Sequence, residues 1–267
     1  MLNRHEDIVH LTPLNPFDRF PDGRPHVPDD LLNRMKLVTV EEAWGVLKQH
    51  GYRYQYAGDW LNVHPERVLV GRAVTAMFVP TRPDLHDVVG EWGRARNSVG
   101  LHNSWVIDTL VENDVVVVDL FGKVKDGTFA EDNLGTAIAN KTKTGMVIDG
   151  GIRDLVRLRE IPDISIFARG CDASAIADVT MTGLNVAIRI GVATVLPGDV
   201  VLGSESGIIF IPPHLVQEVV ERSERTRQED FWGQMRIREG LYTSGQVDGN
   251  WTDAMRADFA AWLETQK

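Results

Sequence analysis

The chain has 267 residues, of which 43% are hydrophobic and 25% are charged, and this balance is typical of a folded globular protein. Its formal net charge of −10 argues against a general nucleic-acid binder, because such a protein needs a basic face to neutralise phosphates. A single cysteine, Cys171, cannot form an internal disulfide, so nothing requires an oxidising compartment.

The first twenty residues carry charges and prolines and contain no apolar run of the signal-peptide type. No stretch approaches the roughly 18 apolar residues of a membrane span. We therefore expect a cytoplasmic protein that binds neither membranes nor nucleic acids.

Residues 1 to about 35 are rich in proline and show little hydrophobic periodicity. This composition predicts an extended arm, either a free tail or a segment packed on a neighbouring subunit. Residues 29–50 have a helical pattern, and Thr39 is a candidate cap for a second helix within them.

From Arg67 onwards, short apolar runs alternate with Gly, Asp and Pro, and we expect these runs to be buried strands. They are Ala73–Val79, Val115–Leu120, Met146–Ile148, Ile164–Ala168, Val186–Ile190, Val192–Leu196 and Ile208–Ile211. The segments with helical patterns are Asn133–Lys143, Leu155–Glu160, Ala173–Met181, a long charged helix from His214 to about Arg238, and Thr252–Glu264.

This alternation predicts a layered α/β fold with an amino-terminal extension and carboxy-terminal helices. We divide the chain into residues 1–66, an arm with helices; 67–213, the α/β core that would carry catalysis; and 214–267, a helical segment that packs on the core or on a neighbouring subunit.

Several common sites are missing from the sequence. There is no G-x-G-x-x-G after a strand, no phosphate-binding G-x-x-x-x-G-K-[ST] loop and no G-x-S-x-G elbow. The eight histidines include no close pair at helical zinc spacing.

One segment stands out, the run from Gly145 to Val156, in which a buried strand leads into Asp149 and two glycines. Arg153 and Asp154 follow at an expected helix start, which places them at the carboxyl edge of the sheet. Asp154 could merely cap the helix while Arg153 is solvated. Alternatively, Asp154 binds a hard divalent cation and Arg153 offers its planar fork to a substrate carboxylate or oxyanion.

A second segment, Glu131 to Thr136, opens the preceding helix. Its free backbone N–H groups and positive dipole end suit a carboxylate ligand. Asp132 could orient a metal-bound water or simply cap this helix.

The order of these motifs resembles a known family. The run from Asp132 to Asp154, followed by Phe167-Ala-Arg-Gly170, Pro197-Gly-Asp-Val200 and Ser206-Gly-Ile-Ile-Phe-Ile-Pro212, resembles the class II pyruvate aldolases. These cleave 4-hydroxy-4-methyl-2-oxoglutarate or 4-carboxy-4-hydroxy-2-oxoadipate. The family also includes the regulators of ribonuclease activity, and the likeness covers roughly residues 67–240.

The resemblance implies a layered α-β-β-α sandwich that assembles as a homotrimer or homohexamer. It implies that Asp154 ligates Mg²⁺ or Mn²⁺ and that Arg153 contacts the substrate and stabilises an enolate.

The same resemblance implies that backbone amides around Asn133, Leu134 and Gly135 hold the carboxylate of a 2-oxo acid. Asp132 matches an acidic residue near the waters on the metal. Glu229, in a run similar to the family's R-x-x-K-E, matches a glutamate that reaches a neighbouring subunit's site.

Two departures from the family pattern accompany these matches: Glu131 stands where glycine is usual, and Arg157 stands where an acidic residue is expected. We therefore expect a metal-dependent lyase that releases pyruvate from a 4-hydroxy-2-oxo acid and could decarboxylate oxaloacetate. The rivals are a non-catalytic protein-binding regulator and a lyase or hydratase acting on a sugar-acid derivative.

Overall fold

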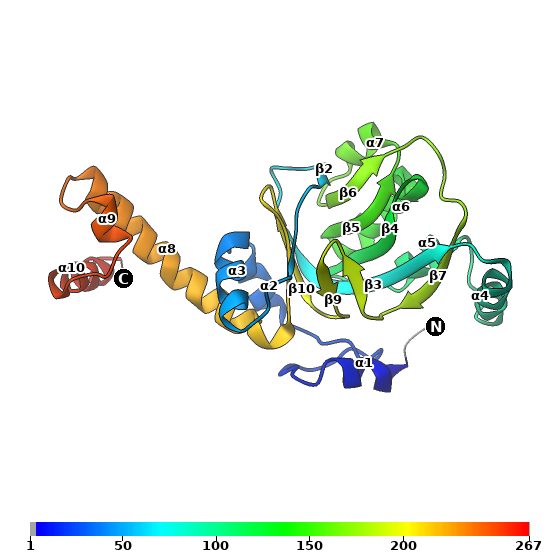
Figure 1. Ribbon diagram of the computed structural model, residues 1–267, viewed down its shortest axis with the longest axis horizontal. Coiled ribbons are helices and arrows are strands. Elements are labelled where there is room, and N and C mark those ends of the chain that lie inside the picture. The colour runs from blue at the N-terminus through cyan, green and yellow to red at the C-terminus, as the bar shows by residue number, and fades with distance from the viewer. Residues whose placement is uncertain (1–3, 267) are drawn as a thin grey trace.

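The computed structural model describes residues 4–266, in which helices and strands alternate through the middle of the chain (Figure 1). The helices are α1 (His5–Leu11), α2 (Asp29–Met35), α3 (Val40–Gln49), α4 (Pro83–Ala95), α5 (His102–Asp108), α6 (Asp132–Thr142), α7 (Leu155–Glu160), the short 3₁₀ turn η1 (Pro213–Leu215), α8 (Val216–Arg238), α9 (Ser244–Val247) and α10 (Asp253–Glu264). The strands are β1 (Tyr56–Ala57), β2 (Leu61–Asn62), β3 (Leu69–Pro80), β4 (Asp114–Ala130), β5 (Gly145–Ile152), β6 (Ser165–Cys171), β7 (Val179–Leu184), β8 (Ile188–Ile190), β9 (Ala193–Val195), β10 (Val200–Ser204) and β11 (Gly207–Ile211).

Most strands form one mixed sheet. Within residues 4–266 it has nine strands in the order β1-β11-β10-β3-β4-β5-β6-β2, and β7 pairs with the end of β3. The central strands β3, β4, β5 and β6 are parallel. Parallel neighbours need crossover connections, and helices α4 to α7 provide them. Because both faces of such strands are covered, Val115–Val118 is a continuous apolar run with no exposed surface.

The core lies in layers on both faces of this sheet. Helices α5, α6 and α7 bury Ile107, Ile138 and Leu158 against one face, and the two-stranded β8–β9 sheet covers part of the other. Helices α2 and α3, with the start of α8, pack over β10 and β11. The rest of α8 runs away from the sheet and carries α9 and α10 at its far end (Figure 1). The predicted α/β fold with mixed sheets and helices at both ends is confirmed.

The amino-terminal helices follow the predicted pattern closely. The backbone N–H of Glu42 donates to Thr39 Oγ1 at 3.1 Å, and the Thr39 N–H donates back to Glu42 Oε2 at 2.8 Å. This reciprocal capping box satisfies two backbone donors at the start of α3. The prediction that Thr39 caps a helix is confirmed.

The arm is not a free tail, because it folds onto the body of its own chain. Arg24 is 2% exposed and donates to the fully buried Asp114 at 2.8 Å. Arg72 donates to the carbonyl oxygen of Val27 at 2.6 Å. The arm also contains helix α1, which its proline-rich composition did not predict.

The helix predicted over Ala173–Met181 is wrong. Residues 173–178 form bends and irregular backbone, and β7 begins at Val179. Thr128 Oγ1 donates to the carbonyl oxygen of Ser174 at 2.6 Å, and the Ala177 N–H donates to that of Asp126 at 2.9 Å. These bonds to β4 replace the hydrogen bonds that a helix would have made.

The helices within residues 4–266 include none with the length and apolar character that crossing a membrane requires.

Candidate functional site

The candidate site lies where β4 and β5 end side by side. Helix α6 starts at Asp132, directly after β4, and α7 starts just after Asp154, which follows β5. The Arg153 N–H donates to the carbonyl oxygen of Ala130 at 3.1 Å and ties the two strand ends together. The acidic segments that are 22 residues apart in the sequence therefore meet at one sheet edge, where open α/β folds commonly bind ligands.

The glycine pair after Asp149 is required by close packing. A Cβ atom on Gly151 would lie 2.5 Å from the carbonyl oxygen of Val124, and one on Gly150 would lie 2.8 Å from Leu120 Cδ2. The second half of β4 thus curls directly over β5, and only glycine fits beneath it.

Asp154 occupies the N-cap position of α7 without capping it. Its backbone is left-handed, with φ 55°, and its side chain accepts no hydrogen bond from the first turn of the helix. The carboxylate is 47% exposed, and one of its oxygens lies 3.8 Å from Arg153 Nε. The alternative that Asp154 is an ordinary helix cap does not hold, and its oxygens remain open to a ligand.

Three carboxylates gather here. Glu131, Asp132 and Asp154 each place one oxygen so that all three lie within 4.8 Å of one another. Carboxylate oxygens are the ligands that hard cations such as Mg²⁺ prefer, so this group, which we call the carboxylate cluster, fits a divalent ion. Hydrogen bonding with Glu131, and then with the Arg157 guanidinium, lowers the pKa of Asp132 to about 2. Asp132 is therefore ionised at neutral pH.

The departures at Glu131 and Arg157 change the surroundings of the cluster. Arg157 Nη1 donates to Asp132 Oδ2 at 2.8 Å. Glu131 is the residue that caps α6, since its carboxylate accepts from the N–H groups of Asn133 at 2.9 Å and Leu134 at 3.2 Å. The amides expected to hold a substrate carboxylate are thus bonded to a carboxylate of the chain itself.

Gly135, whose backbone amide was expected to help hold a substrate carboxylate, also has a packing role. Its N–H donates to the carbonyl oxygen of Glu131 at 2.7 Å, inside the first turn of α6. A Cβ atom at this position would lie 2.6 Å from Leu158 Cδ2. The absence of a side chain lets α6 pack directly against α7.

Glu229 lies apart from the cluster within the chain. It is on α8, where it accepts a hydrogen bond from Arg225 Nε at 2.8 Å, and this helix leads away from the sheet (Figure 1). The structure does not bring Glu229 together with Asp132 and Asp154 in one chain.

Arg169, in the F-A-R-G motif, braces the neighbouring strand ends. Its Nε donates to Asp149 Oδ1 at 2.6 Å, its Nη1 donates to the carbonyl oxygen of Gly58 at 2.8 Å, and its guanidinium lies 3.7 Å from the centre of the Trp60 ring. Sequence reasoning did not anticipate Glu131 as the third acidic group. The available signal was an acidic residue directly before Asp132 at a strand-to-helix junction.

A mixed sheet with carboxylates and an arginine at the ends of two parallel strands defines an α/β protein equipped to hold a cation and a polar ligand at that edge. Comparison with known proteins supplies the family. Residues 29–210 match the model described as RraA-like, Aldolase/RraA, and the chain belongs to this family.

Individual relatives are distant. A putative 4-hydroxy-4-methyl-2-oxoglutarate aldolase of Halalkalibacterium halodurans is 30% identical over 119 residues, which are 44% of this chain and 55% of that protein. The chain therefore matches about half the length of this relative. An uncharacterised protein of Methanocaldococcus jannaschii is 24% identical over 194 residues, covering 65% of this chain and 93% of its own.

Among solved structures, Streptomyces coelicolor RraAS2, described as an unusual member of the RNase ES inhibitor RraA family, is similar with 25% identity and a TM-score of 0.66. The match covers 83% of this chain and all of that one. The family thus includes proteins named as aldolases and proteins named as ribonuclease inhibitors.

Proposed function

We propose that this chain is a divalent-metal-dependent carbon–carbon lyase that cleaves a 4-hydroxy-2-oxo acid and releases pyruvate. The family supports a lyase, and one observation supports this member's activity. Asp154 keeps its carboxylate free of helix capping and holds it beside Arg153 and two further carboxylates.

In this proposal, Asp154 holds Mg²⁺ or Mn²⁺, with Asp132 and Glu131 as the neighbouring acidic groups. The ion would supply Lewis-acid stabilisation of the negative charge that develops when the bond next to the carbonyl breaks. Arg153, 35% exposed beside Asp154, adds a fixed cation at the developing oxyanion. Oxaloacetate decarboxylation passes through the same enolate and is expected as a second activity.

The α6 amides are the second part of the proposed site. Asn133 and Leu134 can bind the carboxylate of a 2-oxo acid only after Glu131 has turned away from them. We propose that Glu131 is displaced when substrate binds. Its exchange for a substrate carboxylate preserves the charge-assisted hydrogen bonds at the helix start.

Glu229 enters the proposal through a second copy of the chain. Because α8 carries it away from the cluster, we propose that it reaches the site of a neighbouring subunit in a homotrimer or homohexamer, where it would help Asp132 to position the group that removes the 4-hydroxyl proton.

The contacts of Glu131 and Arg157 also favour a second candidate, a non-catalytic regulator that binds another protein. In that case the carboxylate on the α6 amides and the Arg157–Asp132 ion pair are permanent, and no substrate displaces them.

The deciding experiment measures pyruvate release from 4-hydroxy-4-methyl-2-oxoglutarate, oxaloacetate and a sugar-acid panel, with Mn²⁺ and after exhaustive chelation. We expect activity only with the metal, and a loss of about 100-fold or more in Asp154→Asn, since a catalytic metal contributes several kcal/mol.

The matched control is Asp163→Asn. Asp163 is also exposed and left-handed, with φ 55°, so both variants remove one surface carboxylate from a conformation that asparagine tolerates well. Full activity in Asp154→Asn or after chelation would refute the metal-dependent mechanism. A folded protein that is inactive on every substrate would favour the regulator.

A further inference from the structure

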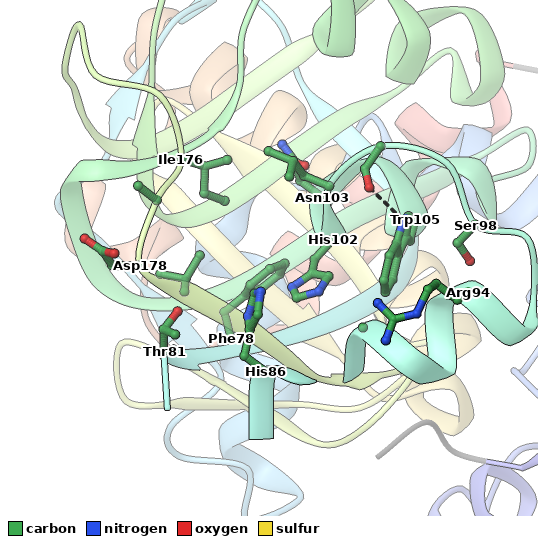
Figure 2. Close-up of a pocket in the computed structure, with 15 residues that line it drawn as sticks. Phe78, Thr81, His86, Arg94, Ser98, His102, Asn103, Trp105, Ile176 and Asp178 are labelled. Atoms are coloured by element: carbon green, nitrogen blue, oxygen red, sulfur yellow. Dashed lines mark hydrogen bonds between the residues drawn. The ribbon is translucent and has the colours of Figure 1, made fainter. Parts of the chain in front are cut away.

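A cavity of about 540 Å³ lies beside helices α4 and α5, at the end of β3 and the start of β7 (Figure 2). This volume is within the range of small-molecule sites. No residue of the carboxylate cluster lines it. The residues on which its chemistry depends are Phe78, His86, Arg94, His102, Trp105 and Asp178.

The apolar wall of the cavity is held in place by specific contacts. The Trp105 indole N–H donates to the carbonyl oxygen of Gly100 at 3.2 Å, which fixes the ring plane. A Cβ atom on Gly93 would lie 2.1 Å from the Trp105 ring, so only glycine lets α4 accept the indole. Phe78 and Ile176 continue this apolar surface in Figure 2.

Hydrogen-bond donors lie at the end of the cavity where Trp105 forms the wall. The His86 and His102 ring centres are 5.3 Å apart, and the His102 ring lies 4.6 Å from Trp105. The Met181 N–H donates to His102 Nδ1 at 3.2 Å, so neutral His102 carries its proton on Nε2. Burial, and then the charge of His86, lowers the pKa of His102, which keeps this ring a neutral donor at pH 7.

Arg94 supplies the charge at this end. Figure 2 shows its side chain beside Trp105 and His102, while the Asp178 carboxylate lies at the opposite end. Within residues 4–266 the guanidinium has no hydrogen-bond or ion-pair partner. A planar guanidinium without a protein acceptor, beside a fixed aromatic wall, matches the carboxylate or phosphate of a ligand with an apolar body.

We propose that this cavity binds a small organic anion with an aromatic or branched apolar body, its charged group against Arg94 and His102 and its body against Trp105 and Phe78. The site is separate from the proposed lyase centre and does not depend on that function. Asn103, in its wall, donates to the carbonyl oxygen of Phe129 at 2.8 Å, two residues before Glu131, so the two sites share one strand end.

The test uses the full chain and benzoate, phenyl phosphate and the neutral analogue benzamide, followed by ligand-observed NMR and calorimetric titration. Saturable binding of at least one anion, with benzamide bound at least about tenfold more weakly, is expected, because hydrogen bonds between charged groups are stronger than those to a neutral amide. The anion that binds more tightly identifies the headgroup as carboxylate or phosphate.

Arg94→Gln should weaken anion binding by about tenfold or more, whereas Arg96→Gln should change it less than about twofold. Arg96 follows the same helix and is exposed, but its guanidinium lies 3.8 Å from the Trp92 ring centre and does not line the cavity. Asp154→Asn should leave the binding unchanged.

The proposal is overturned if neither anion binds saturably, if benzamide binds as well, or if both arginine variants weaken binding equally. Loss of binding in Asp154→Asn would place the anion at the carboxylate cluster and would also overturn it.

Discussion

The two ends of strand β4 use the same residue types for opposite purposes. At its start, Asp114 is fully buried and accepts two hydrogen bonds from Arg24, which is itself 2% exposed. Just beyond its end, Asp132 is paired with Arg157, whose side chain is 72% exposed. An ion pair removed from water fastens the amino-terminal arm to the sheet, whereas carboxylates left in water stay available to a cation.

Removing the buried cation should have the largest effect. Arg24→Ala leaves Asp114 desolvated without its cation and with the Val111 N–H as its remaining donor, and we expect a loss of about 3–5 kcal/mol in the free energy of unfolding, measured by urea denaturation. Arg82→Ala is the control, because its ion pair with Asp84 is exposed on both sides. Equal losses in the free energy of unfolding from the two substitutions would show that burial does not determine how much an ion pair contributes to stability.

Asp199 is a buried carboxylate that has no ion-pair partner within residues 4–266, so the pH dependence of stability tests the effect of burial without a neighbouring cation. Burial raises the pKa of Asp199 from its ordinary 3.8 to about 7, against one hydrogen bond from the Leu196 N–H. The folded state binds this proton more tightly than the unfolded chain does, so the stabilisation is complete below about pH 4 and is lost as the pH rises through 7.

Between pH 5 and pH 8, the wild-type chain should therefore lose about 2 kcal/mol more stability than Asp199→Asn, as judged by urea unfolding at both pH values. Asp163→Asn, which alters an exposed carboxylate, should follow the wild type. If Asp199→Asn keeps the full pH dependence, Asp199 is ionised in the folded protein.

The exposed pair should have the smallest effect. Arg157→Gln breaks the ion pair with Asp132, and we expect little or no change in the free energy of unfolding, because water solvates both groups. The same urea experiment checks it. A loss as large as that of Arg24→Ala would mean that the pair holds α6 and α7 together.

Local pattern predicted much of the fold correctly. The buried runs in β3, β4, β5 and β6 are recognisable because parallel strands covered on both faces must be apolar throughout. The antiparallel strand β11 is recognisable for the same reason, since all of its residues are buried. The Thr39–Glu42 capping box and the strand-to-helix turn before Asp154 depend on residues only a few positions apart. Helices α4 and α5 were not predicted, and with them the cavity around Arg94 and His102 was missed.

The sequence by itself determined the central strands and the helices α6, α7, α8 and α10, and through its ordered motifs it pointed to the pairing of Arg153 with Asp154 at a strand end. Only the tertiary structure decided which groups are available to a ligand. Glu131 rather than Asp132 caps α6, Arg157 reaches back to Asp132 across 25 residues, and Arg24 reaches Asp114 across 90. The physical reason is that strand and helix patterns arise from neighbours in the chain, whereas the state of a charge depends on burial and on partners that folding brings from far away.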